Sequence, residues 1–143
     1  MPFVVDNSVV IGWHLSSQAT DYTDAMLDQL ASDVAHVPAL WPLEFSNVVR
    51  KALTGKKITE ERAREIMQIQ AGLSLIVHAD VPDPAENMAL ALRYNLSSYD
   101  AAYLELAMRL KLPIAAQDEN LRIAAEKSGV GVVRPEAAQS PGS

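Results

Sequence analysis

Two aspartates follow short apolar runs near opposite ends of the chain. Asp6 comes directly after FVV, and Asp118 comes just after PIAA. If both runs are neighbouring strands of a parallel sheet, the two carboxylates lie together beyond the carboxyl ends of those strands. Hard divalent cations such as Mg²⁺ prefer oxygen ligands and keep several waters when bound. The two positions therefore favour a divalent-cation site at one edge of a sheet.

The candidate aspartates also have a plain structural explanation. Asp6 or Ser8 could cap a helix after the first apolar run, and Asp118 could cap the helix that begins ENLRIAA. Asp100 stands three residues after Ser97, in the acidic position of a capping box. The helix dipole stabilises a first-turn acid that can still bind a metal, so the two interpretations do not exclude each other.

Glu44 is harder to explain as a structural residue. In ALWPLEFSNVVRKAL, apolar side chains at helical spacing predict a core-facing stripe of Trp41, Phe45, Val48, Val49 and Ala52. Glu44 falls at the edge of this stripe, where its carboxylate is partly desolvated unless it reaches water. A buried carboxylate without a partner takes up a proton or binds a cation. A surface role and a functional role are both open for Glu44.

Short apolar runs alternate with longer amphipathic segments along the chain. The runs that we expect to form strands cover residues 3–5, 35–37, 75–77, 113–116 and 130–133. Helices are expected to begin near Asp21, Leu40, Thr59, Pro84, Ser98 and Glu119. Gly55 and Gly129 stand where helices should end. This alternation predicts an α/β domain whose mostly parallel sheet is covered by helices on both faces.

The composition is that of one globular domain. With 143 residues, 49% of them apolar, we expect a single domain over 1–136 and a disordered tail over 137–143. The absence of cysteine excludes disulfides, thiolate nucleophiles and Cys-based zinc sites, and it fits a reducing compartment such as the cytoplasm. No run resembles a signal peptide or approaches the roughly 18 apolar residues of a membrane span.

The charge distribution limits how the chain could hold nucleic acid. A net charge of −6 argues against binding that rests mainly on neutralising phosphates, whereas a bound cation would change that balance. The basic segment RKALTGKK, residues 50–57, could place Arg50 and Lys51 against an RNA backbone. The same cations could instead stabilise the helix end before Gly55. Both interpretations are open.

Aromatic and histidine side chains give weaker signals. Stacking on bases is open to Trp13, Trp41, Tyr99 and Tyr103. Trp41 and Tyr103 fall on apolar stripes, which favours packing in the core or at a dimer contact. The three histidines, His14, His36 and His78, form no metal-ligand spacing. Ordinary core or surface positions are expected for them.

Several long segments together resemble a PIN domain of the VapC toxin type. The similarity lies in VVDNSVV, PALWPLEFSNVVRKAL, LSSYDAAYLELAMRLKLPIAAQDENLRIAA and GVGVV. It covers nearly the whole chain, and the third segment is the most specific. The resemblance implies a three-layer α/β/α sandwich with a mostly parallel sheet of about five strands.

The resemblance also implies a function and a set of site residues. It implies a metal-dependent endoribonuclease, the toxin of a toxin-antitoxin pair, that uses Mg²⁺ or Mn²⁺. The family's four acids fall on Asp6, Glu44, Asp100 and Asp118, with Asp6, Asp100 and Asp118 as metal ligands. Ser8 matches a contact to water or phosphate. An RNA substrate, a cognate antitoxin and a homodimer are implied as partners.

Two positions depart from the family pattern. Ala116 stands where many relatives carry Thr, and Asn120 stands where a further acid is common. These departures leave open a catalytically weakened PIN fold that serves as an interaction module. Phosphoryl transfer through an aspartyl-phosphate on Asp6 is disfavoured, because Ser8 occupies the position where such a phosphatase needs a second aspartate.

Overall fold

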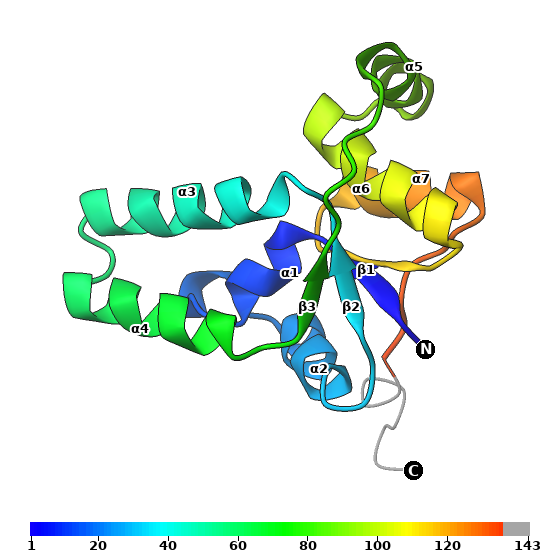
Figure 1. Ribbon diagram of the computed structural model, residues 1–143. Coiled ribbons are helices and arrows are strands. Elements are labelled where there is room, and N and C mark those ends of the chain that lie inside the picture. Colours follow the sequence, from blue (N-terminus) through cyan, green and yellow to red (C-terminus); the bar gives the residue numbers. More distant parts are fainter. Residues whose placement is uncertain (136–143) are drawn as a thin grey trace.

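The computed structural model describes residues 1–135, so the tail expected over 137–143 lies outside the described residues. Strands and helices alternate along the chain (Figure 1). Their bounds are β1 Phe3–Val5, α1 Asn7–Gly12, η1 Ser16–Gln18, α2 Asp21–Gln29, β2 Ala35–Val37, α3 Trp41–Thr54, α4 Glu60–Ala71, β3 Leu75–Val77, α5 Pro84–Tyr94, α6 Ser98–Leu110, β4 Ile114–Ala115 and α7 Glu119–Ser128. Among residues 1–135, no helix has the length and apolar character needed to cross a bilayer.

The sheet is parallel and has the order β3-β2-β1-β4. β1 is therefore central, and the strand order reverses between β1 and β4, as a doubly wound sheet requires. The expectation of about five strands is slightly too high, because the run 130–133 contributes only one bridge, between Ile114 and Val132. Gly129 and Gly131 both have positive φ, so the backbone turns around Val130 instead of extending.

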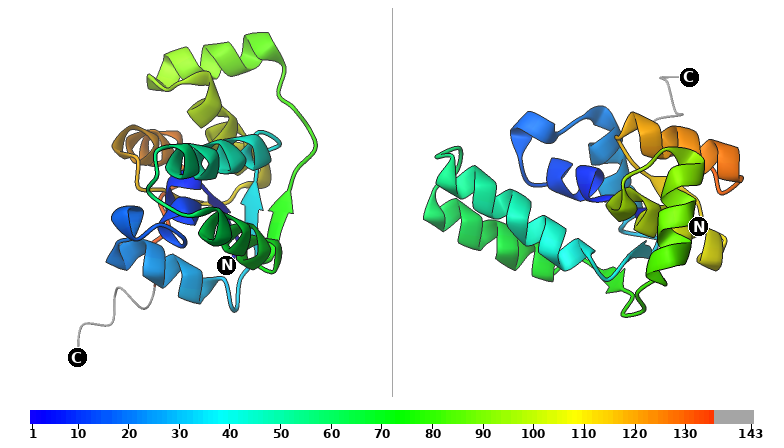
Figure 2. Two further views of the ribbon diagram at one scale, coloured as in Figure 1. Left: turned by 90° about the vertical axis from the view of Figure 1, so that its left-hand side faces the viewer. Right: turned by 90° about the horizontal axis from the view of Figure 1, so that it is seen from above.

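Helices cover both faces of the sheet, which gives the expected three layers (Figures 1 and 2). Phe3 and Val5 point to the face packed by α1, α2 and α3. Val4 points to the opposite face, where α6 and α7 supply fully buried side chains such as Leu104 and Leu121. Because successive side chains of β1 pack against helices on opposite faces of the sheet, β1 lies between two helical layers.

Local sequence signals fix the helix starts as expected. Side-chain oxygens accept a backbone N–H at the N-terminal ends of six helices: Asp6, Thr20, Thr59, Asp83, Ser97 and Asp118. Gly55 and Gly129 follow the last residues of α3 and α7. Helices α3 and α4 run antiparallel and project from the sheet as an arm, which we call the α3–α4 arm (Figure 1).

Candidate active site

Asp6 lies at the junction of β1 and α1, where the chain leaves the sheet. Asp6 is only 6% exposed, and it forms the N-cap of α1. The Oδ2 atom accepts hydrogen bonds from the Ser8 backbone N–H at 3.2 Å and from the Ser8 hydroxyl at 2.6 Å. The capping role is therefore confirmed, and the carboxylate lies at the carboxyl end of the central strand.

The surroundings of Asp6 favour its protonated form. Burial is the largest cause, and the negative charges of Asp100 and Glu44 add to it, so the pKa of Asp6 rises to about 7. The hydrogen bonds from Ser8 act in the opposite direction but are outweighed. A divalent cation bound beside such a carboxyl group would stabilise its ionised form.

Glu44 lies in the first turn of α3 and is half-buried. Its Oε1 accepts a hydrogen bond of 2.6 Å from the hydroxyl of Tyr103, which is fully buried on α6. Burial, and then the charge of Asp100, raise the pKa of Glu44, while the Tyr103 bond lowers it. Tyr103 thus belongs to the core, as expected, and its hydroxyl also links α6 to a candidate catalytic acid.

Asp100 and Asp118 occupy the starts of α6 and α7. The backbone N–H of Asp100 donates a hydrogen bond to Ser97 Oγ, so the Asp100 side chain is not the cap of α6. Asp118 is exposed, and its Oδ2 accepts a hydrogen bond of 2.9 Å from the Leu121 backbone N–H. Burial and the charge of Asp118 raise the pKa of Asp100. The four acids therefore form an electrostatic chain: Glu44 and Asp6 each feel Asp100, and Asp100 feels Asp118.

The acids are near one another without forming a closed ligand cage. Within residues 1–135, no group of three or more His, Asp or Glu side chains is arranged to hold a metal ion by itself. The donors are carboxylate oxygens, and the central one, Asp6, has a raised pKa. This chemistry fits a hard cation that takes one or two carboxylates and keeps several waters, such as Mg²⁺.

Gln117 is a site residue that the sequence reasoning missed. Its backbone N–H donates to Ser8 Oγ at 3.0 Å, and its Nε2 donates to the carbonyl oxygens of Ser8 and Gln18. It also accepts from the Thr20 hydroxyl at 2.8 Å. The Ser8 hydroxyl thus donates to Asp6 and accepts from Gln117. A polar residue between the apolar run and Asp118 was the only signal for it in the sequence.

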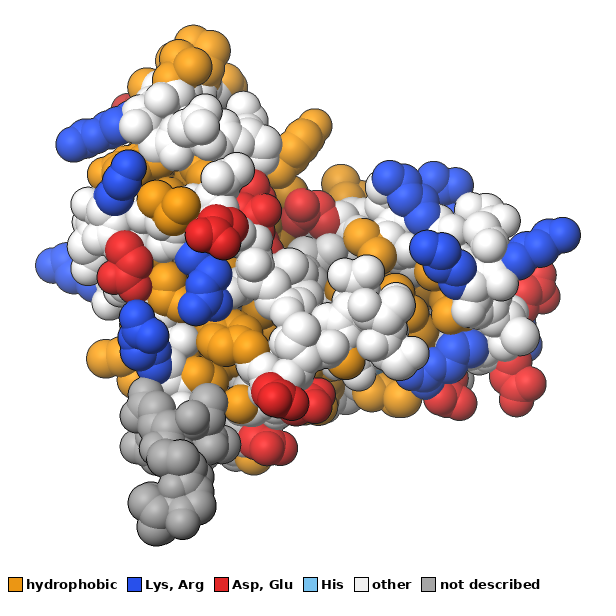
Figure 3. All heavy atoms as spheres, turned by 180° about the vertical axis from the view of Figure 1, so that it is seen from behind, with side chains coloured by type: hydrophobic (Ala, Val, Ile, Leu, Met, Phe, Trp, Pro, Cys, Tyr) orange, Lys and Arg blue, Asp and Glu red, His pale blue; other side chains and the backbone are white. Residues whose placement is uncertain are grey.

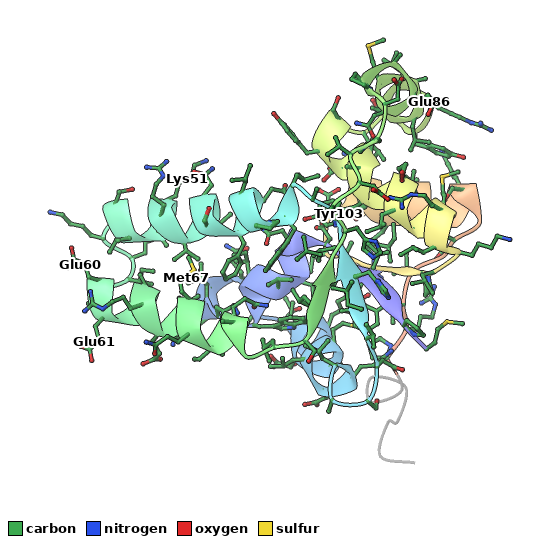
Figure 4. All side chains as sticks on the ribbon, viewed as in Figure 1. Lys51, Glu60, Glu61, Met67, Glu86 and Tyr103 are labelled. Carbon is green, nitrogen blue, oxygen red and sulfur yellow. The ribbon has the colours of Figure 1, made fainter. Side chains whose placement is uncertain are left out.

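The basic residues of the α3–α4 arm face different ways. Lys51 lines a pocket between α1, η1 and α3, whereas Arg50 bonds Asn47 and lines the groove between α3 and α4. Figure 3 shows Asp and Glu side chains gathered near the inner end of the arm and Lys and Arg side chains over its outer part. In Figure 4, Tyr103 lies where α3 and α6 approach the strand ends, and Lys51 extends from α3 away from α4.

Histidines and tryptophan take structural positions. His14 is buried and bonds Gln70 at 2.7 Å, and His36 bonds His78 at 2.8 Å across β2 and the end of β3. Trp41 is buried in the core and stacks on Phe45, which agrees with its expected packing role.

Tyr103→Phe tests the hydroxyl that holds Glu44. The variant removes the hydrogen bond to the half-buried Glu44 carboxylate, which should raise the pKa of Glu44 further. The acid limb of the pH–rate profile for the reaction at this site should therefore move to higher pH. We expect about a three- to ten-fold loss of rate near neutral pH. Tyr99→Phe, at an exposed tyrosine on the same helix, is the control. Identical pH profiles for both variants would contradict a positioning role.

The sequence model of the PIN domain family matches residues 3–127. The chain belongs to the PIN domain family. This PIN domain is also 28% identical over 97 residues to Ribonuclease VapC1 of Mycobacterium tuberculosis, a match found in two strains that covers 66% of this chain and 71% of the relative.

A solved structure agrees on the fold of this PIN domain. It resembles the crystal structure of PAE2754 from Pyrobaculum aerophilum with a TM-score of 0.66 at 18% identity, covering 96% of this chain and 91% of the other. At that identity, the likeness bears on the fold alone.

Proposed function

We propose that this PIN domain is a divalent-metal-dependent endoribonuclease and the toxin of a toxin-antitoxin pair. The observation that carries the proposal is the buried Asp6 carboxyl at the end of the central strand, its pKa raised by burial and by Asp100 and Glu44. Structural acids are normally exposed or paired with cations, whereas Asp6 is buried and lies near the like charges of Asp100 and Glu44. The name of the VapC1 relative, a ribonuclease, supports RNA as the substrate.

The residues divide the work by their positions. Asp6, Asp100 and Asp118 come from three separate elements and would hold Mg²⁺ or Mn²⁺, with Asp6 in the centre. Glu44, oriented by Tyr103, would hold the attacking water and take up its proton. Ser8 and Gln117 fix the Asp6 carboxylate in place. When bound, the cation would lower the pKa of a water and offset charge on the phosphate.

Lys51 and Arg50 are the proposed contacts to the RNA backbone. Both lie on α3 beyond Glu44, on the exposed surface of the α3–α4 arm. Lys51 is seven residues after Glu44, so the Lys51 and Glu44 side chains project from the same helical face, whereas Arg50 faces the groove between α3 and α4. A phosphate chain that passes the carboxylates could therefore continue along this face of α3.

The proposed protein partners are a second copy of the chain and a cognate antitoxin. Exposed apolar side chains occur on β3, on the connection to α5 and on α5 itself, at Ile76, Val77, Val81, Met88 and Leu92, and Met88 and Leu92 lie one turn apart on α5. Single exposed apolar residues are ordinary, but a group of this kind marks a contact surface. We assign this surface to the interface of a homodimer, and we expect light scattering to show a dimer. In Leu92→Asp the dissociation constant of that dimer should rise at least ten-fold. Ile123→Asp on α7 is the control, and equal effects would contradict the assignment.

The direct experiment is cleavage of RNA by the purified chain with Mg²⁺ or Mn²⁺, and again with EDTA. Cleavage that requires the cation supports the nuclease. A chain that folds, takes up Mn²⁺ poorly and leaves RNA intact would instead favour the interaction module suggested by Ala116 and Asn120. The methyl side chain of Ala116 offers no oxygen ligand to the site, and its backbone carbonyl accepts a hydrogen bond from Arg122.

A further inference from the structure

An apolar pocket of about 480 Å³ opens between the start of α3, the first turn of α6 and the segment that leads into α5. Leu43 lines it from α3, and Tyr99 lines it from α6. These two residues directly precede Glu44 and Asp100 in the chain. The pocket therefore adjoins the proposed active site, although none of the four acids lines it.

A contact between α3 and α6 fixes the place of the pocket relative to the acids. The Tyr103 hydroxyl donates a hydrogen bond of 2.6 Å to Glu44 Oε1, so the face of α6 that carries Tyr103 is turned toward the start of α3. Tyr99 stands four residues before Tyr103 and lies on the same face, one turn closer to the helix start. A group bound against Tyr99 would thus lie about one helical turn from the bond that holds Glu44.

The wall of the pocket is open to a ligand. Tyr99 is 67% exposed, and it is the only exposed aromatic residue among residues 1–135. Leu43, on the other helix, is 75% exposed. Single exposed apolar residues are ordinary, whereas exposed apolar side chains that line one pocket mark a binding site.

The charges around the pocket do not suit a phosphate. Among the described residues that line it, only Asp80 is charged, and its Oδ2 lies 3.7 Å from Arg109 Nη1. The complementary group is therefore uncharged, and flat enough to lie against a tyrosine ring. The bases of RNA are groups of this kind, and proteins that bind unpaired bases commonly stack them on aromatic side chains.

We propose that this pocket, which we call the Tyr99 pocket, holds the base of a nucleotide next to the scissile phosphate. The base stacks on the Tyr99 ring and contacts Leu43, while the phosphate lies at the acids. The assignment rests on the proposed ribonuclease function and adds a base-binding residue to it. A base is favoured over a protein side chain because RNA held at Glu44 and Asp100 has to pass the residues that directly precede them. The alternative occupant is the second copy of the chain, since Val81 belongs both to the pocket and to the surface assigned to the homodimer.

The test uses binding, so that it is independent of cleavage. Fluorescence anisotropy in Ca²⁺ would compare a labelled RNA oligonucleotide with a series of RNAs of the same sequence that each lack the base of one nucleotide. For the unmodified protein, we expect one position at which loss of the base weakens binding on the order of ten-fold, the effect of one base stacked on an aromatic ring. A series without any such position overturns the proposal, and this arm needs no variant that could misfold.

The variants link the effect to the pocket. In Tyr99→Ala, the sensitive position should lose its effect, whereas Tyr99→Phe, which keeps the ring, should retain it. Met108→Ala, at an exposed side chain near the other end of α6, is the matched control and should also retain it. If Tyr99→Ala keeps the sensitive position, or weakens every oligonucleotide equally, the base does not bind in this pocket. If Tyr99→Ala weakens the dimer in light scattering and leaves RNA binding unchanged, the occupant is the second copy and the proposal is wrong.

Cleavage of the same RNA with Mg²⁺ separates this inference from the proposed function. A base-loss effect at one position that depends on Tyr99, without cleavage, would leave the Tyr99 pocket standing and refute the nuclease. Cleavage with no such effect would refute only the base-binding role. If the unmodified protein neither binds nor cleaves RNA, both fail.

Discussion

Asp100→Asn is expected to lower the rate of metal-dependent RNA cleavage by a factor on the order of a hundred to a thousand. The variant keeps the size of the side chain but loses the charge that faces Asp6, Glu44 and Asp118. It also keeps the start of α6, because the bond to Ser97 Oγ comes from the Asp100 backbone N–H. A loss of rate without a loss of stability therefore separates a chemical role from a capping role.

The measurement is the initial cleavage rate of a labelled RNA at fixed Mg²⁺, together with thermal unfolding. Asp24→Asn, at an exposed acid in the first turn of α2, is the matched control and should retain full activity. Full activity in Asp100→Asn would remove this residue from the mechanism and leave it as a first-turn acid. Asp118 is less suitable for the test, because its side chain itself caps α7.

Asp6→Asn is expected to stabilise the metal-free protein at pH 8. The pKa of Asp6 is about 7 in the folded state against 3.8 in the reference state, so the folded chain holds this proton more tightly. For an acid whose folded pKa is raised, stability is lost as pH increases from about 4 to 7, and the full penalty remains above pH 7. Removing the charge should recover about 4 kcal/mol at pH 8 and little at pH 4.

Denaturant unfolding in EDTA at pH 4, 6 and 8 would measure this effect. With Mg²⁺ present, the unmodified protein should be more stable than Asp6→Asn. The cation stabilises the unmodified protein by binding its folded state, whereas the variant lacks the central ligand. Asp24→Asn again serves as the control. A variant that is no more stable than the unmodified protein at pH 8 would show that Asp6 is not a strained, buried charge.

Much of the fold could be predicted because its signals are local. The cap at Thr59, the Asp83-Pro84 helix start and the glycine after α7 are set by a few neighbouring residues, and the structure agrees with each. The strand count was less secure, because the run 130–133 has a strand-like composition while the φ angles of Gly129 and Gly131 turn the chain.

The sequence by itself determined which acids follow strands and begin helices, since each of those positions depends on its immediate neighbours. The contacts of those acids depend on residues far away: Tyr103 reaches Glu44 across 59 positions, and Gln117 reaches Ser8 across 109. Only the tertiary structure decided these pairs, along with the burial that raises the pKa of Asp6. Hydrogen bonds and desolvation act over a few ångströms of space, and chain folding alone brings such distant residues within that range.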